Sequence, residues 1–232
     1  MKIQVWSDIM CPFCYIAKKN FEKALEASPF KNEVEIEWKS FQLDPSLKES
    51  SGTMNMSDYM MKRKGFSKTQ LEQFQNQLKE MGKGAGINFN QDTTIAADTF
   101  PAHKLLHLAK EKGKADAMEE ALFEAHFVSG KNIADINFLV SLAEELGLDK
   151  KNARNILSDN AYDYEVKQDI MEAQNLGISG VPYYILDNKY AVSGAQPVEL
   201  FAKALGQTYQ ENIVKLSEES GANTCGADGC SI

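Results

Sequence analysis

Cysteine is scarce in this chain, with four among 232 residues. So few thiols exclude the disulfide scaffold that small secreted domains use in place of a large core. A chain of this length buries roughly 70 to 75% of its unfolded surface without crosslinks. A closely spaced cysteine pair here therefore calls for a chemical explanation.

Positive charge and long apolar runs are also lacking. The 25 Lys and Arg residues face 33 Asp and Glu residues, which gives a net charge of −8. Nucleic-acid binders draw much of their affinity from basic residues on phosphates, so we expect no nucleic-acid partner. Apolar runs such as residues 181–186 are far shorter than the ~20 residues of a membrane span, so we expect no membrane association. Residues 1–8 show no signal-peptide pattern, and the expected location is the cytoplasm.

Hydrophobic periodicity divides the chain into four parts. Residues 1–50 predict a strand at 3–7, a helix after residue 11 and a second, parallel strand at 34–43. Residues 51–176 predict amphipathic helices, including one capped by Ser67 and Gln70. Residues 177–216 predict a β-hairpin and a final helix, and residues 217–232, which are small and polar, are expected to form a mobile tail. The order β-α-β … β-β-α predicts an α/β fold with a four-stranded mixed sheet and a large all-helical insertion.

Cys11-Pro12-Phe13-Cys14 lies where the first strand gives way to the first helix. The N-terminal end of a helix offers unpaired N–H groups and a positive dipole, and both favour a thiolate at Cys11. Cys14 lies one turn further on the same face, where it can attack a mixed disulfide at Cys11. We assign Cys11 as nucleophile and Cys14 as the resolving, more buried thiol, rather than as two small hydrophobic residues.

The sequence resembles the thioredoxin-fold DsbA family, and within it the FrnE-like, cytoplasmic branch of protein disulfide oxidoreductases and isomerases. The matching segments are Asp8 with Cys11-Pro12-Phe13-Cys14, and residues 99–106, 178–184 and 192–197. The resemblance implies a thioredoxin-like fold and protein or peptide thiol and disulfide substrates. It also implies a cis Pro182 beside the cysteines and substrate binding by Val181, Pro182 and Phe13. No histidine separates the cysteines, which implies a less extreme oxidant.

Other polar residues leave alternatives open. Asp8 either transfers a proton or caps the following turn or helix. His103 and His107 have the i, i+4 spacing of metal ligands, but no glutamate of a metalloprotease motif stands between them, so we expect no metal site and a packed or hydrogen-bonded role. His126 has no evident partner. Four methionines near the start of the insertion suit either varied apolar substrates or helix packing: Met54, Met56, Met60 and Met61.

Cys225 and Cys230 near the end of the chain form a candidate second redox pair. Four small, flexible residues between them allow a disulfide at low loop-closure cost. The alternative is a tail with incidental thiols.

Three other functions compete with thiol–disulfide exchange. The first is a glutathione-using isomerase or transferase of the same fold, although such relatives usually carry Ser in place of Cys11. The second is a structural zinc protein whose ligands are the four cysteines. The third is a peptide-binding chaperone. No cofactor is expected, although a thiol such as glutathione could serve as reductant.

Overall fold

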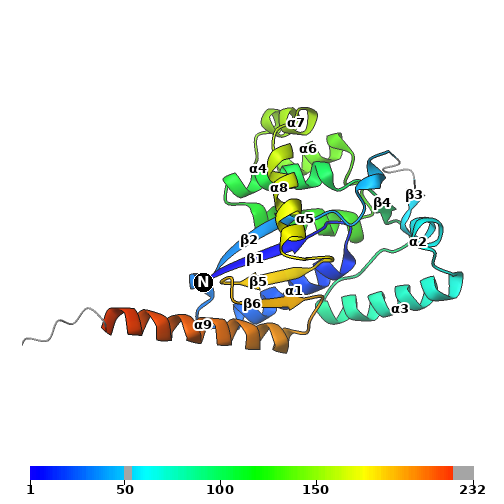
Figure 1. Cartoon of the computed structure of the whole chain (residues 1–232). Helices are drawn as coiled ribbons and strands as arrows, with labels where there is room; N and C mark the ends of the chain where they lie inside the picture. Colours follow the sequence, from blue (N-terminus) through cyan, green and yellow to red (C-terminus); the bar gives the residue numbers. More distant parts are fainter. Residues whose placement is uncertain (50–53, 222–232) are drawn as a thin grey trace, which may run out of the picture.

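A central four-stranded sheet organises the protein (Figure 1). The computed structural model describes residues 1–49 and 54–221. The strand order is β2-β1-β5-β6, with β1 parallel to β2 and antiparallel to β5, and with β5 antiparallel to β6. The bounds are β1 Lys2–Ser7, β2 Glu35–Ser40, β5 Tyr183–Leu186 and β6 Tyr190–Ser193. The predicted mixed sheet is confirmed.

Two of these strands are shorter than predicted. β5 begins at Tyr183 and not at residue 181, because Pro182 has no N–H to donate to the sheet. β2 ends at Ser40, and the Leu43 N–H donates instead to the Asp8 carboxylate at 2.7 Å.

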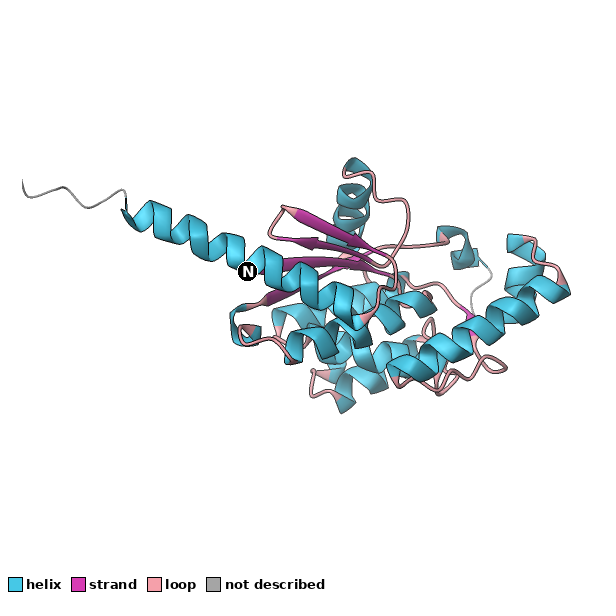
Figure 2. Ribbon diagram, turned by 90° about the horizontal axis from the view of Figure 1, so that it is seen from below, coloured by secondary structure: helices cyan, strands magenta, loops and turns pink. Residues whose placement is uncertain are grey.

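Helices cover both faces of the sheet (Figure 2). On one face, α1 (Pro12–Glu26) packs against α9 (Val198–Gly221), and the core between them and the sheet includes Phe21, Tyr184 and Phe201. On the other face, α8 (Asp163–Asn175) packs on β2, and the Trp6 ring lies against Ala173 and Ile178. Apolar residues on both faces explain why β1 is buried from Val5 to Ser7.

The insertion carries most of the remaining helices. They are α2 Met56–Lys64, α3 Lys68–Ala85, α4 Phe100–Glu111, α5 Ala115–Phe127, α6 Ile136–Glu145 and α7 Lys150–Ser158. The capping box predicted at Ser67 and Gln70 is present at the start of α3. Short 3-10 turns occupy Lys31–Glu33 and Pro45–Glu49.

The prediction of an all-helical insertion is wrong in one respect. Strands β3 (Met54–Asn55) and β4 (Ile95–Ala96) pair antiparallel and bring the two ends of the α2–α3 segment together. Two residues per strand are too few to produce a visible alternation of apolar and polar side chains, so the sequence does not reveal them.

The C-terminal helix is longer than predicted. α9 continues to Gly221, so residues 217–221, assigned to the mobile tail, are helical. Cys225 and Cys230 lie outside the described residues. Within the described ranges, no helix is both long and apolar enough to cross a bilayer.

Candidate functional site

The cysteine pair lies at the junction predicted for it. β1 ends at Ser7, a tight turn closes through the Cys11 N–H to the Asp8 carbonyl at 2.9 Å, and Cys11 is the N-cap of α1. Pro12 fills the first helical position, where a missing N–H leaves no hydrogen bond unmade. Both cysteines are free in this structure.

The two cysteines are buried almost equally, so burial alone does not separate the predicted nucleophile from the predicted resolving thiol. Cys11 is 3% exposed and Cys14 is 2% exposed. They differ in what they face, because Cys11 lines a large cavity whose lining does not include Cys14. Burial, followed by the hydrogen bond and charge of Cys11, raises the pKa of the Cys14 thiol well above its ordinary value.

The cavity beside Cys11 has a volume of about 460 Å³ and lies between the cysteine turn and helices α2 and α3. Phe13 reaches into it and packs edge-on against Phe74, with ring centroids 5.9 Å apart. Met56 and Met60 line the same space, and together with Met54 they pack against a small cluster that includes Met10, Leu47 and Tyr59. The largely apolar lining suits an apolar ligand group beside the Cys11 sulfur.

The Val181–Pro182 peptide bond is cis, as the resemblance implies. The Cys11 thiol lies 3.6 Å from the Val181 carbonyl oxygen, to which it donates a hydrogen bond. The Pro182 carbonyl accepts the Gly194 N–H at 2.9 Å, so this residue is anchored to the end of the hairpin. Val181 thus lies directly beside the predicted nucleophile.

Asp8 is fully buried and accepts hydrogen bonds from two nearby backbone N–H groups. Its carboxylate accepts the Met10 N–H at 3.3 Å and the Leu43 N–H at 2.7 Å. It therefore closes the turn before α1 and does not cap the helix with its side chain. His103 lies 3.7 Å from the same carboxylate and donates from Nε2 to the Phe41 carbonyl at 2.9 Å.

His103 and His107 take structural partners. Burial disfavours a charge on His103, but the hydrogen bond and charge of Asp8 outweigh burial and raise the His103 pKa. His107 Nε2 lies 3.2 Å from the Asp169 carboxylate and its ring stacks on Tyr162. Among the described residues, no group of three His, Cys, Asp or Glu side chains has a geometry that could hold a metal ion.

Glu119 on α5 contacts the last residue of β1, and the sequence analysis did not single it out. Its side chain is buried, and its carboxylate accepts a hydrogen bond from the Ser7 hydroxyl at 2.7 Å. Burial raises the pKa of Glu119 to about 7. The available signal is its spacing, since Glu119 shares one helix face with the buried residues Leu122, Phe123 and His126.

A Cys-x-x-Cys pair at the first strand–helix junction of this mixed sheet, next to a cis proline, defines a thioredoxin-fold dithiol protein. Residues 2–206 match the family model described as a DSBA-like thioredoxin domain. The chain therefore belongs to the DsbA-like family of thiol–disulfide oxidoreductases.

Individual relatives agree with this assignment. The uncharacterized protein YwbO of Bacillus subtilis (strain 168) is 30% identical over 207 residues, which are 88% of this chain and 94% of that protein. The structure of a probable DsbA oxidoreductase from Streptomyces coelicolor has a TM-score of 0.83 and 35% identity, covering 100% of this chain and 99% of that one. The cytosolic disulfide reductase DsbM of Pseudomonas aeruginosa shares the fold, with a TM-score of 0.63 and 18% identity over 90% of this chain and 100% of that one.

Proposed function

We propose that the protein exchanges disulfides with protein or peptide substrates through Cys11 and Cys14. The observation that carries this proposal is the placement of two free thiols on the first turn of α1, with Cys11 facing both the apolar cavity and the Val181 carbonyl. The family match supports the reaction class.

Each cysteine has a distinct step in the proposed reaction. The Cys11 thiolate attacks a substrate disulfide and releases one substrate thiolate. The Cys14 sulfur then attacks the Cys11 sulfur of the mixed disulfide, the second substrate thiolate leaves, and a Cys11–Cys14 disulfide remains. The reverse sequence oxidises a substrate dithiol.

The proposed substrate is an extended peptide with an apolar side chain near its cysteine. Among the described residues, the Val181 N–H has no hydrogen-bond partner, and a peptide backbone can pair with it as an added strand. Phe13 and Pro182 would border that peptide, while the cavity would take its apolar side chain. Proton transfer by Asp8, membership of the FrnE-like branch and a cytoplasmic location are further parts of this proposal.

Glutathione is the reductant or co-substrate to test first. The Pseudomonas aeruginosa reductase DsbM has been solved with GSH, and a 2-hydroxychromene-2-carboxylate isomerase shares this fold with a TM-score of 0.70. Both structures are less than 20% identical to this chain, so they motivate the choice of reductant without fixing the reaction.

Reduction of a fluorescent peptide disulfide by wild type, Cys11→Ser and Cys14→Ser tests the proposal. With glutathione as the reductant, we expect turnover by wild type and none by Cys11→Ser. Without added thiol, a Cys11-linked mixed disulfide should accumulate in Cys14→Ser, because that variant lacks the resolving thiol. Turnover that survives Cys11→Ser would contradict it. Cysteine-independent peptide binding would favour the chaperone, and stoichiometric zinc in reduced protein would favour the metal site.

A further inference from the structure

The cavity beside Cys11 is large enough to hold a whole small molecule. Its volume of about 460 Å³ falls within the range of roughly 300–1,000 Å³ that is typical of small-molecule sites. Its walls include the rings of Phe13, Phe74 and Phe89 and the side chains of Met56 and Met60. Because the cysteine predicted to be the nucleophile is part of the same lining, a ligand that fills the cavity lies against its sulfur.

Polar side chains line part of the cavity, but they donate their hydrogen bonds to the protein. The Gln75 amide donates to the Ser57 hydroxyl at 3.1 Å. The Gln91 amide donates to the Gln75 carbonyl at 2.9 Å, and the Thr94 hydroxyl donates to the Asn90 carbonyl at 2.9 Å. A chain of amide groups inside the cavity would lose its hydrogen bonds to water, which costs free energy, whereas an aliphatic chain has none to lose.

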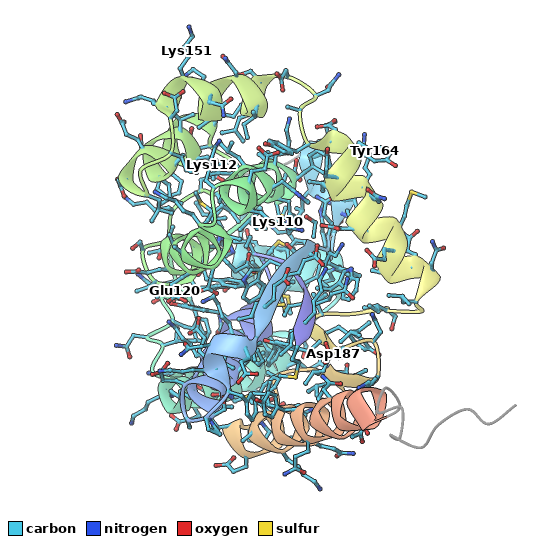
Figure 3. The ribbon with its side chains drawn as sticks, turned by 90° about the vertical axis from the view of Figure 1, so that its left-hand side faces the viewer. Lys110, Lys112, Glu120, Lys151, Tyr164 and Asp187 are labelled. Carbon is cyan, nitrogen blue, oxygen red and sulfur yellow. The ribbon has the colours of Figure 1, made fainter. Side chains whose placement is uncertain are left out.

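Lys64, at the end of α2, is the charged residue of the cavity. Among the described residues that line the cavity it alone is a lysine or arginine, and its side chain is 42% exposed, so it lies where the cavity meets solvent. Its ammonium nitrogen is 3.9 Å from the Asp44 carboxylate, which is too far for a hydrogen bond, and Asp44 also accepts the Tyr59 hydroxyl at 2.8 Å. Exposed lysines elsewhere, such as Lys112 and Lys151 in Figure 3, line no part of this cavity.

We propose that the cavity binds a small aliphatic dithiol, or its cyclic disulfide, whose chain ends in a carboxylate. This inference rests on the proposed thiol–disulfide exchange and adds a substrate class for the same site. The aliphatic chain occupies the apolar interior, the carboxylate pairs with Lys64, and the sulfur atoms lie beside Cys11. A peptide substrate differs, because its backbone pairs with Val181 and only a side chain enters the cavity.

The exchange balances without a further reactant. One ligand thiolate attacks the Cys11 sulfur of the Cys11–Cys14 disulfide, and Cys14 leaves as a thiolate that takes up the proton the ligand has lost. The second ligand thiol then loses its proton and attacks the ligand sulfur of the mixed disulfide. The ligand closes into a cyclic disulfide, and Cys11 leaves as a thiolate. Two electrons pass from ligand to protein, and the reverse sequence reduces the cyclic disulfide.

Octanoate, which has the chain and the carboxylate but no sulfur, tests the site separately from the redox reaction. We expect isothermal titration calorimetry to show octanoate binding to wild type. Lys64→Gln should weaken this binding about threefold, as is usual for the loss of a partly exposed ion pair, and Lys64→Arg should retain it. Lys62→Gln is the matched control and should bind like wild type, because Lys62 is an exposed residue of the same helix that pairs with Asp58 and does not line the cavity.

Dihydrolipoate and dihydrolipoamide then supply one dithiol with and without the charge. In the oxidised full chain carrying Cys225→Ser and Cys230→Ser, mass spectrometry after acid quenching follows reduction of the Cys11–Cys14 disulfide. We expect the rate to saturate with dihydrolipoate and octanoate to compete. Lys64→Gln should raise the half-saturating concentration of dihydrolipoate about threefold and leave that of dihydrolipoamide unchanged.

The outcomes separate this inference from the proposed function. Absence of octanoate binding, or equal binding by wild type and Lys64→Gln, would overturn the inference. Reduction of the Cys11–Cys14 disulfide by a peptide dithiol but not by dihydrolipoate would overturn it as well and leave the proposed function intact. If neither dithiol reduces the disulfide although octanoate binds as expected, the proposed function itself is wrong.

Discussion

Two buried titratable side chains, His126 and Glu119, give the protein opposite responses to pH. Burial lowers the pKa of His126 to about 4 and raises that of Glu119 to about 7. Between pH 4 and the ordinary histidine pKa near 6.5, the unfolded chain binds a proton at His126 that the folded protein does not. Stability from His126 is therefore full above pH 6.5 and falls as the pH drops toward 4.

We predict that His126→Leu makes the protein less sensitive to acid. Relative to its own stability at neutral pH, the variant should lose about 3 kcal/mol less than wild type on acidification to about pH 4. Urea unfolding at a series of pH values measures this difference. Parallel curves for the two proteins would show that His126 does not titrate with folding.

The raised pKa of Glu119 predicts the opposite dependence of stability on pH. The folded protein retains a proton at Glu119 between its ordinary pKa of 4.5 and about 7, so this group lowers stability as the pH rises through that interval. Glu119→Gln should therefore gain up to about 3 kcal/mol over wild type between about pH 4.5 and pH 8. The same unfolding series checks it, and no gain at the higher pH would mean that Glu119 is not held protonated.

At the scale of elements, helix α3 forms one wall of the cavity and provides a matched pair of glycines. A Cβ on the buried Gly82 would lie 2.4 Å from Phe89 Cδ2, and Phe89 lines the cavity beside Cys11. We expect Gly82→Ala to displace that ring and to raise the KM for apolar peptide disulfides several-fold. Alkylation of Cys11 by iodoacetamide should be unchanged, because so small a reagent reaches the Cys11 sulfur without filling the part of the cavity beside Phe89.

Gly84→Ala is the control on the same helix. Nothing lies within 4 Å of a Cβ at Gly84, so this substitution should leave the KM unchanged and stabilise the helix by about 0.5–1 kcal/mol. Equal KM values for wild type and both variants would show that the cavity does not take part in substrate binding.

The elements also show what the sequence can and cannot reveal. The β1–α1 junction, the hairpin and the α3 cap are predictable, because alternation, Pro12 and Ser67 act locally. The β3–β4 pair depends on contacts between segments about forty residues apart, which local patterns do not record. Glu119 was missed for a related reason, since only tertiary packing places one glutamate of an acidic helix against Ser7.

For the whole molecule, Cys225 and Cys230 are predicted from the sequence to exchange electrons slowly with Cys11 and Cys14. A tethered thiol can reach a millimolar effective concentration, whereas an acidic residue such as Asp228 close in sequence is expected to slow the exchange. We expect mild oxidation to produce a tail disulfide or a link from the tail to Cys11. The Cys225→Ser/Cys230→Ser variant should then turn over more slowly than wild type. Unchanged turnover, with neither crosslink found by mass spectrometry, would show that Cys225 and Cys230 are not a second redox pair.

A redox titration in glutathione buffers tests the central claim most directly. After equilibration and acid quenching, mass spectrometry of the peptide containing Cys11 and Cys14 gives the fraction joined by a disulfide. The account predicts one two-electron transition, in which a change of ~30 mV alters the ratio tenfold, and its midpoint gives the direction of electron flow. Cys14→Ser should show only a mixed disulfide with glutathione at Cys11. Failure of the Cys11–Cys14 disulfide to form at any glutathione ratio would contradict the account.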